Sequence, residues 1–273
     1  MPALRDKTIA IVGGGTMGSA IALGLVRTGS LEPQRVLVAD PCQDRRDHLA
    51  SEGIQVFDAA SSMGATSPDV VIIAVKPQVL PDVVKKASDL LGGRLVISIA
   101  AGVKLQALES LMPTSRIIRA MPNLPIWAVS GATAVCAGSA VTRGDVGLAS
   151  ALFGCLGCTL VMREDQLDTE GAVVSCGPAY IALFADLLVR AGVEHGLPAA
   201  GCREMVLSTM RGVAGQLLES GEHPRAYMER VTSPGGTTAA GLRAMEPSLM
   251  LAVEEGIDAA LARTAELGQA KGE

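Results

Sequence analysis

The sequence is poor in aromatic residues and has no excess of positive charge. Aromatic side chains make up 2% of the 273 residues, and the formal net charge is -5. A protein that binds nucleic acid needs basic side chains against the phosphates and, for single strands, aromatic rings against the bases. Both shortages argue against a nucleic-acid partner.

Long apolar runs and paired cysteines are also scarce. The longest weakly polar stretch, residues 172–185, is interrupted by a serine, a glycine and a proline and is shorter than the roughly 20 apolar residues of a spanning helix. The first residues show no apolar signal core. Cys155 and Cys158 lack the further ligands of a zinc site and are expected to be buried apolar filler. We therefore expect a soluble cytoplasmic protein with no membrane segment and no metal.

Short apolar runs alternate with helical patterns in the first part of the chain. The expected strands are residues 8–12, 35–39, 55–57, 70–75, 95–99, 117–119 and 132–136. Several are apolar at consecutive positions, as in parallel strands covered on both faces. Helical patterns lie between them at 17–28, 79–91, 105–111 and 143–153. Repeated βαβ units follow, so residues 1–163 are expected to form a Rossmann-type α/β domain.

The strand patterns stop after about residue 163. Long helical patterns follow at 164–191, 199–220 and 248–267, separated by turns rich in glycine and proline. These helices carry more apolar positions than a lone layer of three helices can bury. Residues 164–273 are therefore expected to form an all-α domain that associates with a second copy of the chain.

A glycine-rich segment joins the first expected strand to the first helix. Its residues Gly13-Gly-Gly15-Thr16-Met17-Gly18 fit the GxGxxG pattern, and their place between a strand and a helix makes the pattern specific. Gly13 permits a tight turn, Gly15 lets the backbone approach a pyrophosphate, and Gly18 lets the helix pack closely on the strand. The N–H groups of the helix N-terminus then bind the anion, so this segment predicts a dinucleotide site.

Asp40 ends the second expected strand, where dinucleotide-binding folds place an acidic residue on the ribose. A carboxylate there accepts hydrogen bonds from the ribose hydroxyls of NADH and repels the 2′-phosphate of NADPH. Arg45 and Arg46 follow one helical turn later and could either reach such a phosphate or form a solvated helix face. Asp40 favours NADH but leaves NADPH open.

Six further motifs follow along the chain: Ala74-Val-Lys-Pro77, Ser98-Ile-Ala-Ala-Gly102, Ile118-Arg-Ala-Met-Pro-Asn123, Gly177-Pro-Ala-Tyr180, Ser220-Gly-Glu-His-Pro224 and Val231-Thr-Ser-Pro-Gly-Gly-Thr-Thr238. In order and spacing they resemble those of pyrroline-5-carboxylate reductases, over nearly the whole chain. The resemblance implies reduction of 1-pyrroline-5-carboxylate to L-proline by hydride transfer from NAD(P)H, the last step of proline biosynthesis.

The resemblance also implies which residues form the site. The nicotinamide half of the cofactor would be lined by Val75, Lys76, Pro77, Ala100, Ala101, Met121 and Asn123. The substrate would be held by Val231, Ser233, Gly235, Gly236, Thr237 and Thr238. In the family this second set comes from the partner subunit of an interlocked homodimer, which can assemble into a higher homo-oligomer.

The last motif suits an imino acid on its own terms. Its backbone N–H groups and hydroxyls, ahead of a short expected helix at 239–245, offer a concave site for a carboxylate. The alternative is an ordinary proline–glycine turn with Thr238 as a helix cap. A loop at 245–248 is expected to separate the short helix from the one that follows.

Lysine is absent between Lys104 and Lys271, and the helical part has only two histidines, His195 and His223. Reduction of a ketone needs a proton donor for the developing alkoxide, normally one of these residue types. A cyclic imine arrives protonated, so hydride addition neutralises charge and the enzyme mainly positions the substrate. Thr238 then suffices to hold the ring nitrogen and is the expected catalytic residue, while His223, in a turn, is expected to be structural.

Three alternatives remain. Residues 174–178 read Val-Ser-Cys-Gly-Pro where the family has Ser-Gly-Ser-Gly-Pro, and Leu124 replaces the usual threonine, so a related imine, six-membered or sulfur-containing, stays open as the substrate. A β-hydroxyacid dehydrogenase would need a lysine on the long helix, which the sequence does not provide. An inactive nicotinamide-binding regulatory protein would have no use for the imino-acid motif.

Overall fold

The computed structural model describes residues 4–269, and its internal contacts divide the chain into two units. The first unit runs to Cys176 and includes the chain from Leu261 onward, and the second is Gly177–Ala260. Sequence patterns instead predict a domain boundary between residues 163 and 164, and that boundary stays a prediction.

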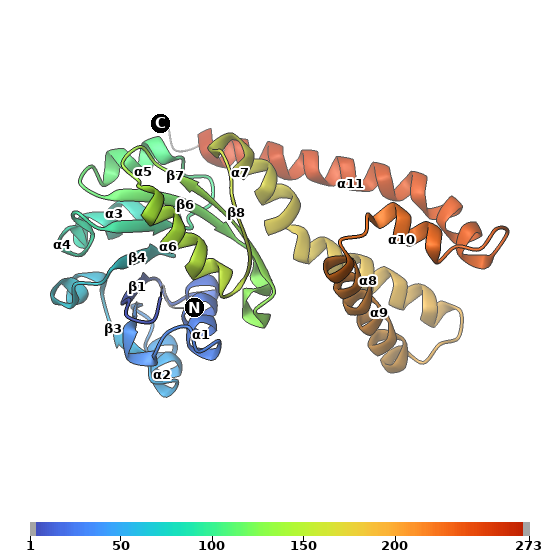
Figure 1. Ribbon diagram of the computed structural model, residues 1–273, viewed down its shortest axis with the longest axis horizontal. Coiled ribbons are helices and arrows are strands. Elements are labelled where there is room, and N and C mark those ends of the chain that lie inside the picture. The colour runs from blue at the N-terminus through green and yellow to red at the C-terminus, as the bar shows by residue number, and fades with distance from the viewer. Residues whose placement is uncertain (1–3, 270–273) are drawn as a thin grey trace. The chain divides into compact units, whose positions relative to one another are not determined.

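The first unit is built on an eight-stranded sheet (Figure 1). Its strands are β1 (Ile9–Val12), β2 (Val36–Ala39), β3 (Gln55–Phe57), β4 (Val70–Ile73), β5 (Leu95–Ser98), β6 (Arg116–Pro122), β7 (Gly131–Ala137) and β8 (Gly157–Val161). The strand order is β3-β2-β1-β4-β5-β6-β7-β8, with β1 to β6 all parallel. The chain crosses over between β3 and β4, so the carboxyl ends of β1 and β4 flank a topological switch point, where such folds bind dinucleotides.

Helices cover both faces of the sheet (Figure 1). One face packs against α1 (Thr16–Arg27), α2 (Gln43–Ser51) and α6 (Arg143–Gly154). The other packs against α3 (Leu80–Lys86), α4 (Ser88–Leu91), α5 (Leu105–Leu111) and α7 (Glu164–Glu170). Shorter 3-10 turns are η1 (Pro33–Arg35), η2 (Ala60–Thr66) and η3 (Leu124–Ala128). Successive residues of β1 enter opposite clusters, which is why the strand is apolar at every position.

The last part of the sheet differs from the sequence-based expectation. β7 runs antiparallel to β6, and β8, which was not predicted, is parallel to β7. Three of the five residues of β8 are exposed, so it lacks the continuous apolar pattern that marks the central strands. Cys158 lies in this strand and is exposed, so the prediction that it is buried filler was wrong. The single helix expected at 79–91 is two helices, α3 and α4, that meet at Ala87.

The second unit consists of helices. A π-helical turn, η4 (Gly171–Ser175), leads to α8 (Gly177–Glu194), followed by α9 (Ala199–Ser220), α10 (Pro224–Arg230) and α11 (Thr237–Gln269). α8 and α9 pack side by side (Figure 1). Between residues 177 and 260, Ala185 and Cys202 are the only buried residues. The apolar side chains of this unit therefore lack an internal core that could cover them.

α11 is one continuous helix, where two helices and an intervening loop at 245–248 were expected. Pro247 lies inside it. Proline removes one backbone hydrogen bond and usually ends or bends a helix. Here the flanking residues, rich in alanine, leucine and methionine, are strong helix formers, and the helix continues through the proline.

One helical stretch, residues 164–194, is long and apolar enough to cross a bilayer by length and composition. Its most apolar 18-residue window has a mean hydropathy of 1.9, and 11% of that window is buried. The serine, glycine and proline that were expected to interrupt it lie within the helical path. The same exposed apolar surface also fits another protein chain, because core and interface helices reach similar hydropathy.

Candidate active site

The glycine-rich loop connects β1 to α1, and its three key glycines meet different surroundings. Gly13 has a φ of +108, and a Cβ there would lie 2.7 Å from the carbonyl oxygen of Ala74. A Cβ on Gly18 would lie 1.9 Å from the Gly13 carbonyl oxygen. At Gly15 the nearest atom is Arg45 Nη1, at 3.9 Å, so that position faces open space. The loop therefore combines a tight turn, close helix packing and room for a ligand.

A cleft of about 850 Å³ opens in front of this loop, at the carboxyl ends of β1, β2 and β4. The residues that line it include Gly13, Gly15, Thr16, Met17, Asp40, Arg45, Ser61, Val75, Lys76 and Lys86. Its position at the switch point of the sheet is the one that nucleotide ligands occupy in doubly wound folds. Three cationic side chains in its wall suit an anionic ligand.

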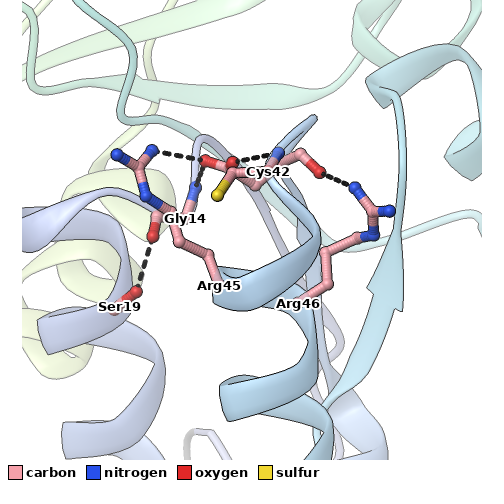
Figure 2. A network of polar contacts seen from close by, with 6 residues as sticks. Gly14, Ser19, Cys42, Arg45 and Arg46 are labelled. Carbon is pink, nitrogen blue, oxygen red and sulfur yellow. Dashed lines mark hydrogen bonds and ion pairs between the residues drawn. The ribbon is translucent and has the colours of Figure 1, made fainter.

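Asp40 holds the glycine loop from within the protein, and Figure 2 shows its labelled partners Gly14, Cys42, Arg45 and Arg46. Its side chain is buried, with Oδ2 accepting the N–H of Gly14 and Oδ1 accepting that of Cys42, both at 2.8 Å. Arg45 Nη1 lies 3.3 Å from Oδ2, and Arg46 Nη1 donates to the Asp40 carbonyl oxygen at 2.7 Å. Both arginines thus bond to Asp40, and Arg45 also faces the cleft.

A serine on α1 completes this network. Ser19 Oγ donates to the Gly14 carbonyl oxygen at 2.7 Å (Figure 2). Gly14 is thereby held through its N–H by Asp40 and through its carbonyl by Ser19. The backbone of the loop is fixed before any ligand binds, which lowers the entropy cost of binding.

The residues expected beside the nicotinamide follow β4, β5 and β6. Val75 and Lys76 line the cleft, whereas Pro77, Ala100, Ala101, Met121 and Asn123 lie outside its lining. Asn123 is buried; its Oδ1 accepts the N–H of Ala132 at 2.8 Å and its Nδ2 donates to the Val174 carbonyl at 3.3 Å. Because these strands are parallel neighbours, their carboxyl ends lie at the same edge of the sheet as the cleft.

In the second unit, the expected substrate residues form the turn between α10 and α11. Gly235 has a φ of +71, and the N–H of Gly236 donates to the Ser233 carbonyl at 3.0 Å. α11 begins at Thr237, so Thr238 lies in its first turn and the alternative of Thr238 as a cap is wrong. Ser233, Thr237 and Thr238 are exposed, as is Val231 just before the turn.

His223 serves as a helix cap. Its Nδ1 accepts the N–H of Arg225 at 3.2 Å at the start of α10. This confirms the structural role expected for it. Among residues 4–269, no three His, Cys, Asp or Glu side chains are placed to hold a metal ion.

Two family models match the chain. The first, described as pyrroline-5-carboxylate reductase dimerisation, matches residues 164–267, and the second, described as NADP oxidoreductase coenzyme F420-dependent, matches residues 8–102. Pyrroline-5-carboxylate reductase from Synechocystis sp. is 37% identical over 96% of this chain and 98% of its own. That from Arabidopsis thaliana is 35% identical over 96% of this chain and 95% of its own.

The chain belongs to the pyrroline-5-carboxylate reductase family. The solved structure of such a reductase from Coxiella burnetii matches with a TM-score of 0.89 and 32% identity, covering 96% of this chain and 99% of that one. A Plasmodium falciparum pyrroline carboxylate reductase with NADP bound matches with a TM-score of 0.87 and 26% identity, covering 97% and 99%. The expected Rossmann-type fold with a helical second part is confirmed, and the dimerisation match explains why the helices leave apolar side chains for another copy.

The structure of this reductase also brings together charged residues that the sequence interpretation missed. Arg119 of β6 is 1% exposed, and its guanidinium lies 3.2 Å from Glu164 Oε1 and 2.9 Å from Asp168 Oδ1 on α7. Glu164 Oε1 also accepts the N–H of Leu105 at 2.6 Å. Two features of the sequence could have indicated this cluster: an arginine within an apolar strand, and two acids spaced i, i+4 on a later helix. These bonds fix α7 to the sheet.

Glu170, at the end of α7, was missed as well. It is 7% exposed, and Oε2 accepts a hydrogen bond from Ser175 Oγ at 3.3 Å. Burial raises the pKa of Glu170 to about 7 and outweighs the bond from Ser175, which acts in the opposite direction. In the sequence Glu170 is only the last of four acids, directly ahead of the apolar run Gly171-Ala-Val-Val.

Proposed function

We propose that this reductase converts 1-pyrroline-5-carboxylate into L-proline with NAD(P)H in the cytoplasm, as the last step of proline biosynthesis. The observation that carries the proposal is the presence, in one chain, of a preformed dinucleotide loop and an exposed turn rich in hydroxyl and N–H groups at the start of α11. Relatives of this name match over nearly the entire chain.

The cofactor residues of the first unit bind and orient NAD(P)H, which supplies the hydride when bound. The open space at Gly15 leaves room for the pyrophosphate, and the N–H groups of the first turn of α1 would donate hydrogen bonds to it. Thr16 and Met17 belong to that turn, and Asp40 holds the loop by accepting the N–H of Gly14. The residues that follow β4, β5 and β6, from Val75 to Asn123, would hold the nicotinamide.

The turn in the second unit binds the imino acid. The N–H groups of Thr237 and Thr238 stand at the positive end of a 33-residue helix, where a carboxylate is favoured, whereas the N–H of Gly236 closes the turn on Ser233. Ser233 adds a hydroxyl beside them, and Thr238 Oγ1 accepts the N–H of the ring. Gly235 and Gly236 let the turn close, because Gly235 has a positive φ and a Cβ on Gly236 would lie 2.4 Å from Ser233 Oγ.

The reaction needs no strong acid from the protein. The substrate enters as an iminium cation, and hydride addition to its ring carbon leaves a neutral amine. Charge disappears in this step, so the residues contribute alignment and exclusion of water. This agrees with a helical part that offers no lysine before Lys271 and whose His223 is engaged as a cap.

We also propose NADH as the preferred coenzyme. The Asp40 carboxylate is fixed at the ribose corner of the cleft, and a 2′-phosphate beside it would meet a negative charge. Arg45 is already paired with Asp40, which reduces its attraction for a phosphate. A relative from Plasmodium falciparum was solved with NADP, so the two coenzymes need a direct comparison.

The protein is proposed to act as a homodimer, or a multiple of it, in which the α10–α11 turn of one copy serves the cofactor cleft of the other. The start of the dimerisation match at residue 164 supports the domain boundary between residues 163 and 164. The exposed apolar side chains of α8 and α9 supply the contact surface. Obligate interfaces between copies are apolar in this way.

The test is coenzyme oxidation by the purified protein in the presence of 1-pyrroline-5-carboxylate or its six-membered homologue, with each coenzyme. We expect oxidation that depends on the imino acid, formation of L-proline, and a higher kcat/KM for the five-membered ring. A higher value for the six-membered ring would reassign the substrate. Coenzyme binding without any substrate-dependent oxidation would contradict the proposal and favour the alternative of an inactive regulatory protein.

A further inference from the structure

Two acidic side chains are buried in the described part of the chain, Asp40 and Glu170. Asp40 holds the glycine loop, whereas Glu170 has no part in the function proposed above. Its hydrogen bond to Ser175 spans the η4 turn from one end to the other. A buried carboxyl whose one hydrogen-bond partner is a neutral hydroxyl lowers the free energy of unfolding. Glu170 is therefore a candidate for a functional role.

The η4 turn that Glu170 precedes packs against the end of β6. The N–H of Cys176 donates to the Gly171 carbonyl at 3.0 Å, which is the wider i+5 bond of a π-helix. A Cβ on Gly171 would lie 3.7 Å from Met121 Cε, and the Val174 carbonyl accepts from Asn123 Nδ2. π-helical turns are rare and are often found at functional sites. This one supports two residues of the proposed nicotinamide wall.

No cation is paired with Glu170 among the described residues. The elements that contact α7 or η4 carry Glu164, Asp165 and Asp168 of α7, Arg116 and Arg119 of β6, and Cys136 of β7 as charged or titratable groups. The end of α11, in the same unit, adds Arg263 and Glu266, which pair with each other. Arg119 is already bonded to Glu164 and Asp168, and Arg116 to Asp145. Burial and the Ser175 bond are the causes that act on the pKa of Glu170. Its carboxylate form would therefore be an uncompensated buried charge.

We propose that protonated Glu170 is a positioning residue for the nicotinamide wall: it holds the η4 turn against Met121 and Asn123, and loss of its proton loosens that turn and weakens coenzyme binding. The proposal rests on the proposed function, because it assigns the nicotinamide to this wall. The neutral acid fits the apolar interior, whereas the anion draws water or moves outward, and the turn moves with it. Below a pH of about 7 the binding-competent form predominates, and above it that form is lost.

The experiment measures the dissociation constant of NADH by calorimetry between about pH 6 and about pH 9, a range that brackets the pKa of Glu170 at about 7. NADH is the probe because, unlike NADPH, it has no phosphate that titrates near neutrality. Measuring binding instead of turnover keeps the protonation of the imine out of the profile. For the full-length protein we expect affinity to fall at least tenfold across this range, since about a tenth of the acid stays neutral one unit above its pKa.

Two variants and one control test whether Glu170 causes the change of NADH affinity with pH. Glu170→Gln keeps the shape of the protonated acid and should bind NADH with the same affinity at every pH, close to the wild-type value at low pH. Ser175→Ala removes the bond that favours the anion and should move the inflection to higher pH. Glu52→Gln, at an exposed acid of the same unit, should leave the profile unchanged.

A flat wild-type profile, or an inflection that persists in Glu170→Gln, would overturn the inference. An unmoved inflection in Ser175→Ala would also count against it, and this variant keeps the test valid if Glu170→Gln fails to fold. Absence of NADH and NADPH binding at every pH would instead overturn the proposed function. The two failures are therefore distinguishable.

Discussion

The two units of the chain use their apolar residues in opposite ways. In the first unit, two clusters of buried side chains fill both faces of the sheet, and β1, β2, β4 and β5 are buried at every position. In the second unit, large apolar side chains face outward, among them Ile181 at 60%, Leu183 at 59% and Met205 at 69% exposed. Most apolar side chains of the first unit are covered within it, whereas those of the second unit are left for another copy of the chain.

The largest effect is expected where the first unit is packed most tightly. Gly18→Ala places a Cβ 1.9 Å from the Gly13 carbonyl oxygen, so α1 or the loop must shift. We expect a loss of about 3 kcal/mol or more in the free energy of unfolding. Coenzyme binding should be lost with it. Chemical denaturation and calorimetry with NADH measure both.

Gly147→Ala is the matched control for that experiment. Gly147 lies in α6 of the same unit, and a Cβ there would meet no atom within 4 Å. The substitution should be neutral or slightly stabilising, because alanine is the better helix former. Equal destabilisation by both substitutions would show that glycine content, and not the close contact at Gly18, matters.

A second prediction breaks the association of the second unit. Leu183→Asp introduces a charge into the exposed apolar face of α8. We expect the association constant to fall by about a hundredfold or more, since a charge buried at an interface without a partner is costly. Sedimentation should then show smaller species, with turnover lost and NADH binding by the first unit retained.

The control is an exposed leucine of the first unit. Leu111, at the end of α5, is 38% exposed. Leu111→Asp should leave the oligomer intact if association belongs to the helices of the second unit. An intact oligomer in Leu183→Asp, or dissociation in Leu111→Asp, would contradict the contrast between the units.

The contrast also explains which parts of the fold could be predicted from the sequence. Central strands such as β4 are covered on both faces, so they are apolar at every position and were predicted to within two residues. β8 lies at the edge of the sheet, where exposed positions remove that pattern. α11 was predicted in two pieces, because Pro247 is a local signal for a break and the continuation of a helix depends on its neighbours.

The site could be proposed from the sequence where its chemistry depends on residues that lie close together along the chain. The glycine loop and the turn before α11 each occupy fewer than ten consecutive positions, and the structure brings each together as one local feature. Arg119 and Glu164 are 45 residues apart and meet only through the packing of α7 on the sheet. The raised pKa of Glu170 comes from burial, and no local sequence pattern predicts that burial.

A third prediction separates the tasks of the two units. Thr238→Ala removes the hydroxyl that we propose accepts the ring N–H, and it should lower kcat by about 10- to 100-fold, as for the loss of one hydrogen bond to a charged group. The dissociation constant of NADH should stay unchanged, because coenzyme binding belongs to the first unit. Thr209→Ala, in α9, is the control and should leave both quantities as they are. Unchanged turnover in Thr238→Ala would remove Thr238 from the mechanism.

The smallest effect concerns coenzyme choice, which the first unit alone should decide. Asp40→Ser removes the negative charge from the proposed ribose position and should shift the ratio of kcat/KM for NADPH over NADH about tenfold upward, roughly 1.4 kcal/mol. Arg45→Ala should shift the ratio in the opposite direction, because it removes a cation that lines the cleft. Serine retains one acceptor for the Gly14 N–H, so the loop keeps part of its support and the ratio, not the absolute rate, is the measure. If neither substitution moves the ratio, the Asp40 and Arg45 pair does not select the coenzyme. Lys76 and Lys86, the other cationic side chains that line the cleft, would then be tested in the same way.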